Sequence, residues 1–115
     1  MSNQALSLPL PEKGETGPYS LVGNARAKPG LADALEERLV SMVAPTRRES
    51  GCLAYHVHRD RADPSLFVFY EAWRSLDDLE RHFLEPHVST FLEERHRYLD
   101  GDLDVTWLRM ASVFG

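Results

Sequence analysis

The sequence predicts a single α+β domain in which one antiparallel sheet carries helices on one of its faces. Three observations lead to this prediction. The chain has 115 residues, a length that one compact domain accounts for. Its apolar segments switch between the two-residue period of strands and the 3.6-residue period of helices. These segments follow one another in the order strand, helix, strand, strand, helix, strand.

The first part of the chain supplies a tail, a strand and a helix. Residues 1–18 hold three of the seven prolines and show no sustained period, so we expect a flexible tail. Alternating leucines in this tail would suit an extended arm: Leu6, Leu8 and Leu10. Residues 19–28 have the pattern of a first strand. Residues 31–44 place apolar groups at helical spacing and predict a helix, which Pro45 should interrupt.

Two neighbouring strands are predicted in the middle of the chain. Residues 52–59 form the second strand, and the polar residues 60–64 are typical of a hairpin turn. Residues 65–73 are apolar or aromatic at almost every position, which indicates a central strand covered on both sides. Alternation divides its side chains into two faces, one with Phe67, Phe69, Glu71 and Trp73, the other with Leu66, Val68, Tyr70 and Ala72.

A divided helix and a last strand complete the pattern. Ser75 is a helix N-cap, and Asp78 lies three residues later, as in a capping box. The helix that follows has an apolar face made by Leu76, Leu79 and Phe83. Pro86 suits the first turn of a second helix over residues 86–99. Residues 103–112 alternate as a final strand.

This order defines the ferredoxin-like split β-α-β-β-α-β arrangement over residues 19–115, with a four-stranded antiparallel sheet and helices on one face. The strands carry apolar side chains on both faces, so the uncovered face of the sheet is too apolar to remain in water. A homodimer with two sheets packed face to face would bury it.

Composition excludes several functional classes. Eighteen acidic residues against 13 basic ones give a net charge of −5, which argues against a nucleic-acid partner. Cys52 is the only cysteine, so an intrachain disulfide is impossible. No run of about 20 apolar residues predicts a membrane span, and the N-terminus lacks the pattern of a secretion signal. A cytoplasmic protein is the expectation.

Three segments of the chain resemble the antibiotic biosynthesis monooxygenase family of dimeric α+β barrels. They are ESGCLAYHVHRD (49–60), FVFYEAW (67–73) and LERHFLEPHVSTF (79–91), and the resemblance extends over residues 19–113. It implies a small-molecule site on a fold that supports several chemistries. Members of the family include oxygenases that convert multi-ring phenols or quinols into quinones with O₂, without flavin or metal. Other members degrade haem, isomerise a phosphorylated sugar-like signal, or have no known activity.

The resemblance therefore implies a cofactor-independent monooxygenase that acts on a phenolic or quinol-type aromatic substrate. One alternative is an isomerase or lyase acting on a small polar metabolite, which would need cations such as Arg26 or Arg47 beside His87. Another is a non-catalytic dimeric module that binds a ligand.

Two histidines are the leading candidates for the catalytic base. His87 lies near a predicted helix N-terminus, where the macrodipole disfavours the protonated ring that a base must avoid. It could instead cap the helix or bond a backbone carbonyl. His82 lies on the preceding helix and could share a pocket with His87. It could equally be a half-buried residue whose polar end reaches water.

Three further residues are candidates for polar roles. Trp73 could aim its N–H at a substrate oxygen, or could be a core tryptophan bonded to a carbonyl. Glu71 needs a partner if it is buried, and Arg74 or Arg109 could provide a salt bridge. Asn24 can both donate and accept hydrogen bonds, and so could serve as a secondary donor.

Aromatic side chains are expected to form the walls of the pocket: Tyr70, Phe83 and Phe91. His56 and His58 share one side of the second strand and could ligate a metal. No carboxylate or cysteine completes a ligand set with them at metal-binding spacing, so no metal site is expected.

Overall fold

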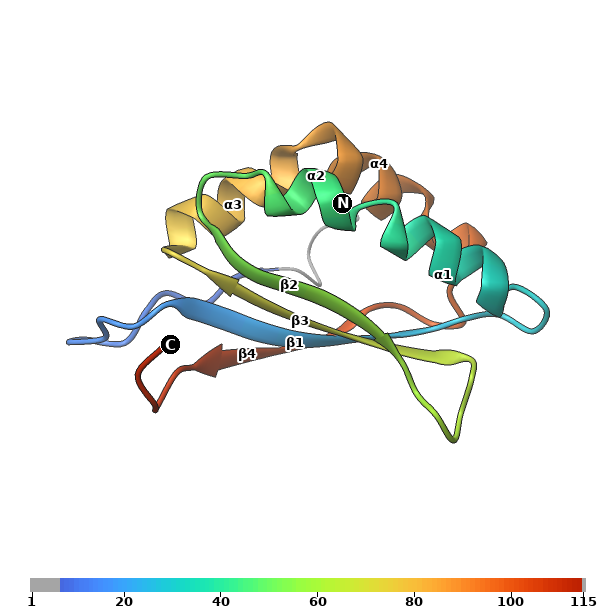
Figure 1. Ribbon diagram of the computed structural model, residues 1–115, viewed down its shortest axis with the longest axis horizontal. Coiled ribbons are helices and arrows are strands. Elements are labelled where there is room, and N and C mark those ends of the chain that lie inside the picture. The colour runs from blue at the N-terminus through green and yellow to red at the C-terminus, as the bar shows by residue number, and fades with distance from the viewer. Residues whose placement is uncertain (1–6, 115) are drawn as a thin grey trace.

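The structure, a computed structural model, describes residues 7–114 and confirms the predicted order of strands and helices. The elements are β1 (Tyr19–Arg26), α1 (Ala32–Val40), α2 (Val43–Arg47), β2 (Cys52–Arg59), β3 (Leu66–Trp73), α3 (Leu76–Leu84), α4 (Pro86–Glu94), the 3₁₀ helix η2 (Arg95–Arg97) and β4 (Asp104–Arg109). All strand pairs are antiparallel, in the spatial order β2-β3-β1-β4. The four α-helices lie on one face of the sheet, and the opposite face is open (Figure 1).

The first helical region ends earlier than predicted. α1 stops at Val40, and Pro45 lies inside α2 instead of breaking a longer helix. Pro45 is the third residue of α2, within the first turn, where a backbone N–H has no acceptor inside the helix. The missing donor therefore costs α2 little. The last helix is also shorter than predicted, because its final turn tightens into η2.

The N-terminus of α3 has the predicted cap and also fixes the turn before β2. The Ser75 hydroxyl accepts a hydrogen bond from the Asp78 N–H at 3.2 Å and donates to the Asp78 carboxylate at 2.9 Å. Asp78 is buried, and a hydrogen bond from Arg74 lowers its pKa. A Cβ on Gly51 would lie 2.2 Å from Asp78 Cγ. Glycine is therefore required there, and Gly51 packs closely against α3.

The faces of the central strand follow the predicted alternation. Phe67, Glu71 and Trp73 are buried on the side that the helices cover. Val68 and Tyr70 lie on the open side and are only partly buried. In β2 the pairing with β3 shifts between Cys52 and Ala54, so one extra residue bulges out of the ladder. That residue, Leu53, is 42% exposed.

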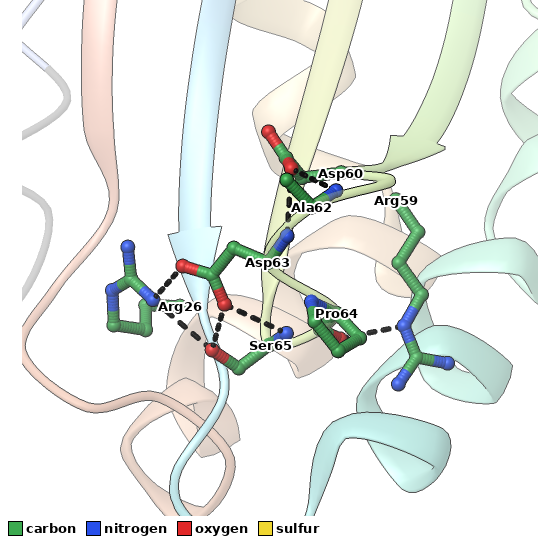
Figure 2. A network of polar contacts seen from close by, with 7 residues as sticks. All are labelled: Arg26, Arg59, Asp60, Ala62, Asp63, Pro64 and Ser65. Carbon is green, nitrogen blue, oxygen red and sulfur yellow. Dashed lines mark hydrogen bonds and ion pairs between the residues drawn. The ribbon is translucent and has the colours of Figure 1, made fainter.

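The hairpin between β2 and β3 is held by a polar network (Figure 2). Asp60 Oδ1 accepts hydrogen bonds from the Ala62 and Asp63 amides, each at 2.8 Å. Arg26 forms an ion pair with Asp63 at 2.7 Å. Arg26 is opposite Leu66 at the start of β3. Glu71 lies five residues further along β3, about 17 Å away at the rise of a strand.

The tail before β1 contacts the body of its own chain. Leu8 packs against the apolar cluster that contains Tyr19, whose hydroxyl donates a hydrogen bond to the Pro9 carbonyl. Glu12 lies 3.4 Å from Arg109 of β4. The expected arm included Leu6, which lies outside the described residues. Within residues 7–114, no helix is long and apolar enough to cross a membrane.

Candidate functional site

A cavity of about 40 Å³ lies between the sheet and the helices. Its lining comes from all four strands, from α1, α3 and α4, and from the segments that join them. Most of this lining is aliphatic or aromatic, with Leu21, Leu39, Val88, Phe69, Phe91 and Trp107 as representatives. Among the described residues that line it, Glu71 and His82 carry the ionisable groups of an acid–base pair. The cavity is therefore an apolar space with its acid–base chemistry on one wall.

Behind this wall, one carboxylate joins two histidines. Glu49 Oε2 lies 2.9 Å from His82 Nδ1 and 2.8 Å from His87 Nε2. The two ring centroids are 6.3 Å apart. The His82 side chain is 2% exposed, that of Glu49 13% and that of His87 20%. The cluster thus runs from the buried cavity wall, through Glu49, to a partly exposed ring.

The local fold explains how these three side chains meet. α3 ends at Leu84. The next residue, Glu85, has an extended backbone that breaks the helix, and Pro86 then begins α4. His82 and His87 consequently lie on opposite sides of this break. Glu49 is in the turn between α2 and β2, and its backbone is fixed by hydrogen bonds to Thr46 and Cys52. The packing of Gly51 against Asp78 brings this turn to α3.

The His82 ring is held on several sides. Its Nε2 lies 3.8 Å from Glu71 Oε1, which is ion-pair range but too long for a hydrogen bond. The Trp73 ring centroid is 4.5 Å away, and Tyr55 makes an edge contact at 5.8 Å. These contacts restrict the orientation of a nearly buried ring, with Nδ1 hydrogen-bonded to Glu49 and Nε2 directed toward Glu71.

Glu71 does not form the predicted salt bridge with an arginine. Arg74 pairs with Asp78, and Arg109 lies beside Glu12. Glu71 Oε1 instead accepts a hydrogen bond from Trp73 Nε1 at 3.0 Å. Burial raises the pKa of Glu71, while the nearby His82 and the Trp73 hydrogen bond act in the opposite direction. Glu71 therefore holds a proton more readily than an exposed carboxylate does.

The structure brings together only part of the predicted set. Glu71, His82, Phe83 and Phe91 line the cavity. His87 reaches it only through Glu49, since its own side chain is not part of the lining. Trp73 is fully buried in the core and donates to Glu71, so it does not aim its N–H into the cavity.

Two predicted residues lie on the wrong side of the sheet for this cavity. Asn24 pairs with Val68, and Tyr70 pairs with Val22, all in positions that face away from the helices. Neither Asn24 nor Tyr70 is part of the cavity lining. The alternation along β3 puts Tyr70 and Phe69 on opposite faces of the sheet, and Phe69 is the one that lines the cavity.

Sequence reasoning assigned no role to two important residues. Glu49 is 33 residues before His82 and 38 before His87, in a turn with no periodic pattern. Tyr55 lines the cavity, and burial raises its pKa well above the ordinary value. The alternation of β2 indicates a buried position for Tyr55, whereas only the packed fold identifies Glu49.

The comparisons with known proteins agree with this architecture. The chain belongs to the antibiotic biosynthesis monooxygenase family, whose model matches residues 18–94. The solved structure of PA3566 from Pseudomonas aeruginosa is 37% identical, with a TM-score of 0.80, covering 85% of this chain and 98% of that one.

Two curated relatives match most of the chain. An uncharacterized protein of Synechocystis is 31% identical over 101 residues, 88% of this chain and 69% of the relative. Rv0793 of Mycobacterium tuberculosis, provisionally named a monooxygenase, is 30% identical over 93 residues, 81% of this chain and 91% of the relative. Its solved structure has a TM-score of 0.78. Fold and family are thereby established, and the reaction and its substrate are matters for proposal.

Proposed function

We propose that this protein is a monooxygenase that oxidises a phenolic or quinol-type multi-ring compound with O₂, without a flavin or a metal in the reaction. The observation that carries this proposal is the apolar cavity with one acid–base wall formed by Glu71 and His82. Membership of the monooxygenase family supports it. A flat aromatic substrate suits the apolar lining, and the Glu71–His82 pair on the wall suits removal of its acidic proton.

In this reaction the substrate supplies the electrons. His82 takes a proton from an activated ring carbon or from its phenol, with Glu71 beside it, and the resulting anion delocalises over the rings. Electron transfer to O₂ and recombination give a peroxide at the ring carbon. Loss of water then leaves a carbonyl, so that one oxygen atom enters the product and the other leaves as H₂O.

The second carboxylate has a role in the same step. Once His82 is protonated, its ring is positively charged inside an apolar region, which is costly without compensation. Glu49 Oε2 lies 2.9 Å from the Nδ1 of this ring, and Glu71 Oε1 lies 3.8 Å from its Nε2. Their negative charges stabilise the imidazolium, and the partly exposed His87 provides a route for the proton to solvent through Glu49.

The substrate has to widen the cavity. A cavity of about 40 Å³ is far smaller than the roughly 150 Å³ that holds benzene in an engineered protein core. Several lining residues are only partly buried: Phe69, Phe83, Val105 and Trp107. Binding therefore involves displacement of these side chains rather than entry into a rigid, preformed pocket.

The isomerase alternative lacks its expected cation. Arg26 is held by Asp63 at the far end of the sheet (Figure 2). Arg47 donates to the Tyr55 carbonyl and contacts His56 at the edge strand β2. Neither arginine lines the cavity, so a phosphorylated or carboxylated ligand would have no counter-charge there.

A homodimer formed through the open face of the sheet belongs to the same proposal. This face carries the partly buried Val22, Val68 and Tyr70 on the two central strands, and the helices leave it uncovered (Figure 1). An apolar sheet face of this kind is normally buried against a partner. A second copy supplies a matching face related by a two-fold axis.

The test is oxygen uptake by purified, metal-stripped protein with a panel of anthrone- and quinol-type compounds. We expect turnover above the uncatalysed rate, its loss in His82→Gln, and its retention in His96→Ala, which removes an exposed histidine on η2. Absence of turnover across the panel would contradict the oxygenase proposal and leave a ligand-binding module as the better account.

A further inference from the structure

Glu49, His82 and His87 present three metal-ligand atoms to one point. We propose that these three side chains bind a divalent first-row transition-metal ion, through Glu49 Oε2, His82 Nδ1 and His87 Nε2. The three atoms come from three separate segments and lie within 4.8 Å of one another. This binding site does not depend on the oxygenase reaction proposed above.

The ligand types suit such an ion. Two imidazoles and one carboxylate are a common protein set for Zn²⁺ and for Fe²⁺, and they leave coordination positions open for water or a ligand. Ca²⁺ and Mg²⁺ prefer oxygen ligands and are poorly matched by two ring nitrogens. The site therefore selects a transition metal over the abundant hard cations.

The distances require only small movements. Ligand atoms about 2.0–2.2 Å from a tetrahedral ion are roughly 3.3–3.5 Å from one another. Glu49 Oε2 is already 2.9 and 2.8 Å from the two ring nitrogens. Replacing the shared protons by an ion thus means that Glu49 moves back by about half an ångström from each ring, and that the two ring nitrogens, which lie within 4.8 Å of each other, adopt the same spacing. His87 is 20% exposed and is free to adjust at the surface.

The surroundings add the support that metal-bound histidines usually have. A ligating imidazole commonly directs its second nitrogen at a carboxylate, which fixes the ring and increases its basicity. His82 Nε2 lies 3.8 Å from Glu71 Oε1, and Trp73 anchors that same oxygen at 3.0 Å. An ion with two positive charges would also balance the two carboxylates of this region.

The second histidine pair makes a natural internal control. His56 and His58 are exposed on β2, with ring centroids 6.4 Å apart. Arg47 lies 3.2 Å from His56 Nδ1, and its permanent charge repels a metal ion at that ring. A histidine pair alone, without a carboxylate, should therefore bind much more weakly than the three-ligand cluster.

Metal binding and the proposed reaction make opposite demands on the same atoms. An ion on His82 Nδ1 replaces the proton that this nitrogen donates to Glu49, and so it prevents proton transfer between the two histidines through Glu49. Added metal is consequently expected to inhibit the oxygenase, while chelation restores it. Metal affinity can be measured with no substrate present, so failure of one proposal does not imply failure of the other.

The experiment is titration of the full chain, free of any histidine tag, with Co²⁺ followed by visible absorption and with Zn²⁺ followed by calorimetry. We expect one ion per chain. We also expect an affinity loss on the order of 100-fold or more in Glu49→Gln and in His87→Gln, since even supporting residues are worth 10–100-fold. The double variant His56→Ala/His58→Ala should stay within about twofold of the original chain.

Both ligand variants are chosen to keep the fold, because their side chains are not fully buried, and thermal unfolding of the metal-free proteins verifies this. Zn²⁺ should raise the unfolding temperature of the original chain and of the His56→Ala/His58→Ala protein but not of Glu49→Gln. No saturable binding, equal affinity in Glu49→Gln, or loss of binding only in the His56/His58 variant would each overturn the proposal.

Discussion

The two histidine pairs of this protein have almost the same spacing and very different surroundings. The ring centroids of His82 and His87 are 6.3 Å apart, and those of His56 and His58 are 6.4 Å apart. The first pair is bridged by the carboxylate of Glu49 and partly buried. The second pair is exposed, and its near neighbour is the cation of Arg47.

This difference shows that proximity of two rings does not by itself make a site. The carboxylate and the burial distinguish the pairs, and both come from elements distant in sequence. A buried carboxylate stabilises an imidazolium or completes a metal-ligand set. A guanidinium beside an exposed ring does neither. The predictions below separate the two pairs experimentally.

The largest expected effect is on catalysis at the buried pair. His82→Gln should lower O₂-dependent turnover by about 10²–10⁴-fold, the usual contribution of an acid–base group. His56→Ala/His58→Ala should change turnover by less than about twofold, because neither ring lines the cavity. Steady-state oxygen uptake measures both, and equal losses in the two variants would show that the pairs are not distinct.

His56 and His58 are exposed on the single chain but lie on the face that we propose to be the dimer interface, so the dimer provides a second way to distinguish the two pairs. Val68 is opposite His58 in the ladder. Val68→Lys should raise the dimer dissociation constant by about 100-fold or more, because it would bury a charge in an apolar interface. Thr90→Lys, on an exposed position of α4, is the matched control. Sedimentation of both variants tests this, and an unpaired original chain would refute the interface.

A smaller effect is expected where the cavity meets β1. A Cβ on Gly23 would lie 2.1 Å from Cζ of Phe69 and would force that ring into the cavity. Gly23→Ala should cost about 1–3 kcal/mol of unfolding free energy and raise KM more than it lowers kcat. Gly17→Ala is the control, since its nearest contact would be an ordinary 3.8 Å. Denaturant unfolding and kinetics give both numbers, and no change in Gly23→Ala would contradict the packing.

The smallest expected effect is a pH dependence of stability due to Glu71. Its folded pKa is raised by burial above the ordinary 4.5. At pH values between the unfolded and the folded pKa of Glu71, the folded state binds more protons than the unfolded chain. The contribution of Glu71 to stability is therefore lost as the pH rises through this range. Glu71→Gln removes this term and should become more stable relative to the original chain as the pH rises above about 4.5. Urea unfolding across that range checks it, and parallel curves would contradict the assignment.

The sequence by itself determined the order of the elements, the divided second helix, the cap at Ser75 and the two faces of the central strand. These features depend on local periods and on residues a few positions apart, which a single chain displays directly. The same periodicity placed Phe83 and Phe91 on faces that meet the core, and they line the cavity. It also placed Tyr70 on the opposite face from Phe69.

The tertiary structure alone decided how the polar groups are connected. It brought Glu49 to His82 and His87, directed the Trp73 N–H to Glu71, and put Asn24 on the open face. None of these contacts has a period in the sequence. A carboxylate in a turn lies beside a histidine 33 residues later, where Gly51 packs against Asp78 and accepts a hydrogen bond from the Arg74 amide. Burial then fixes its partners by making any unpaired charge costly.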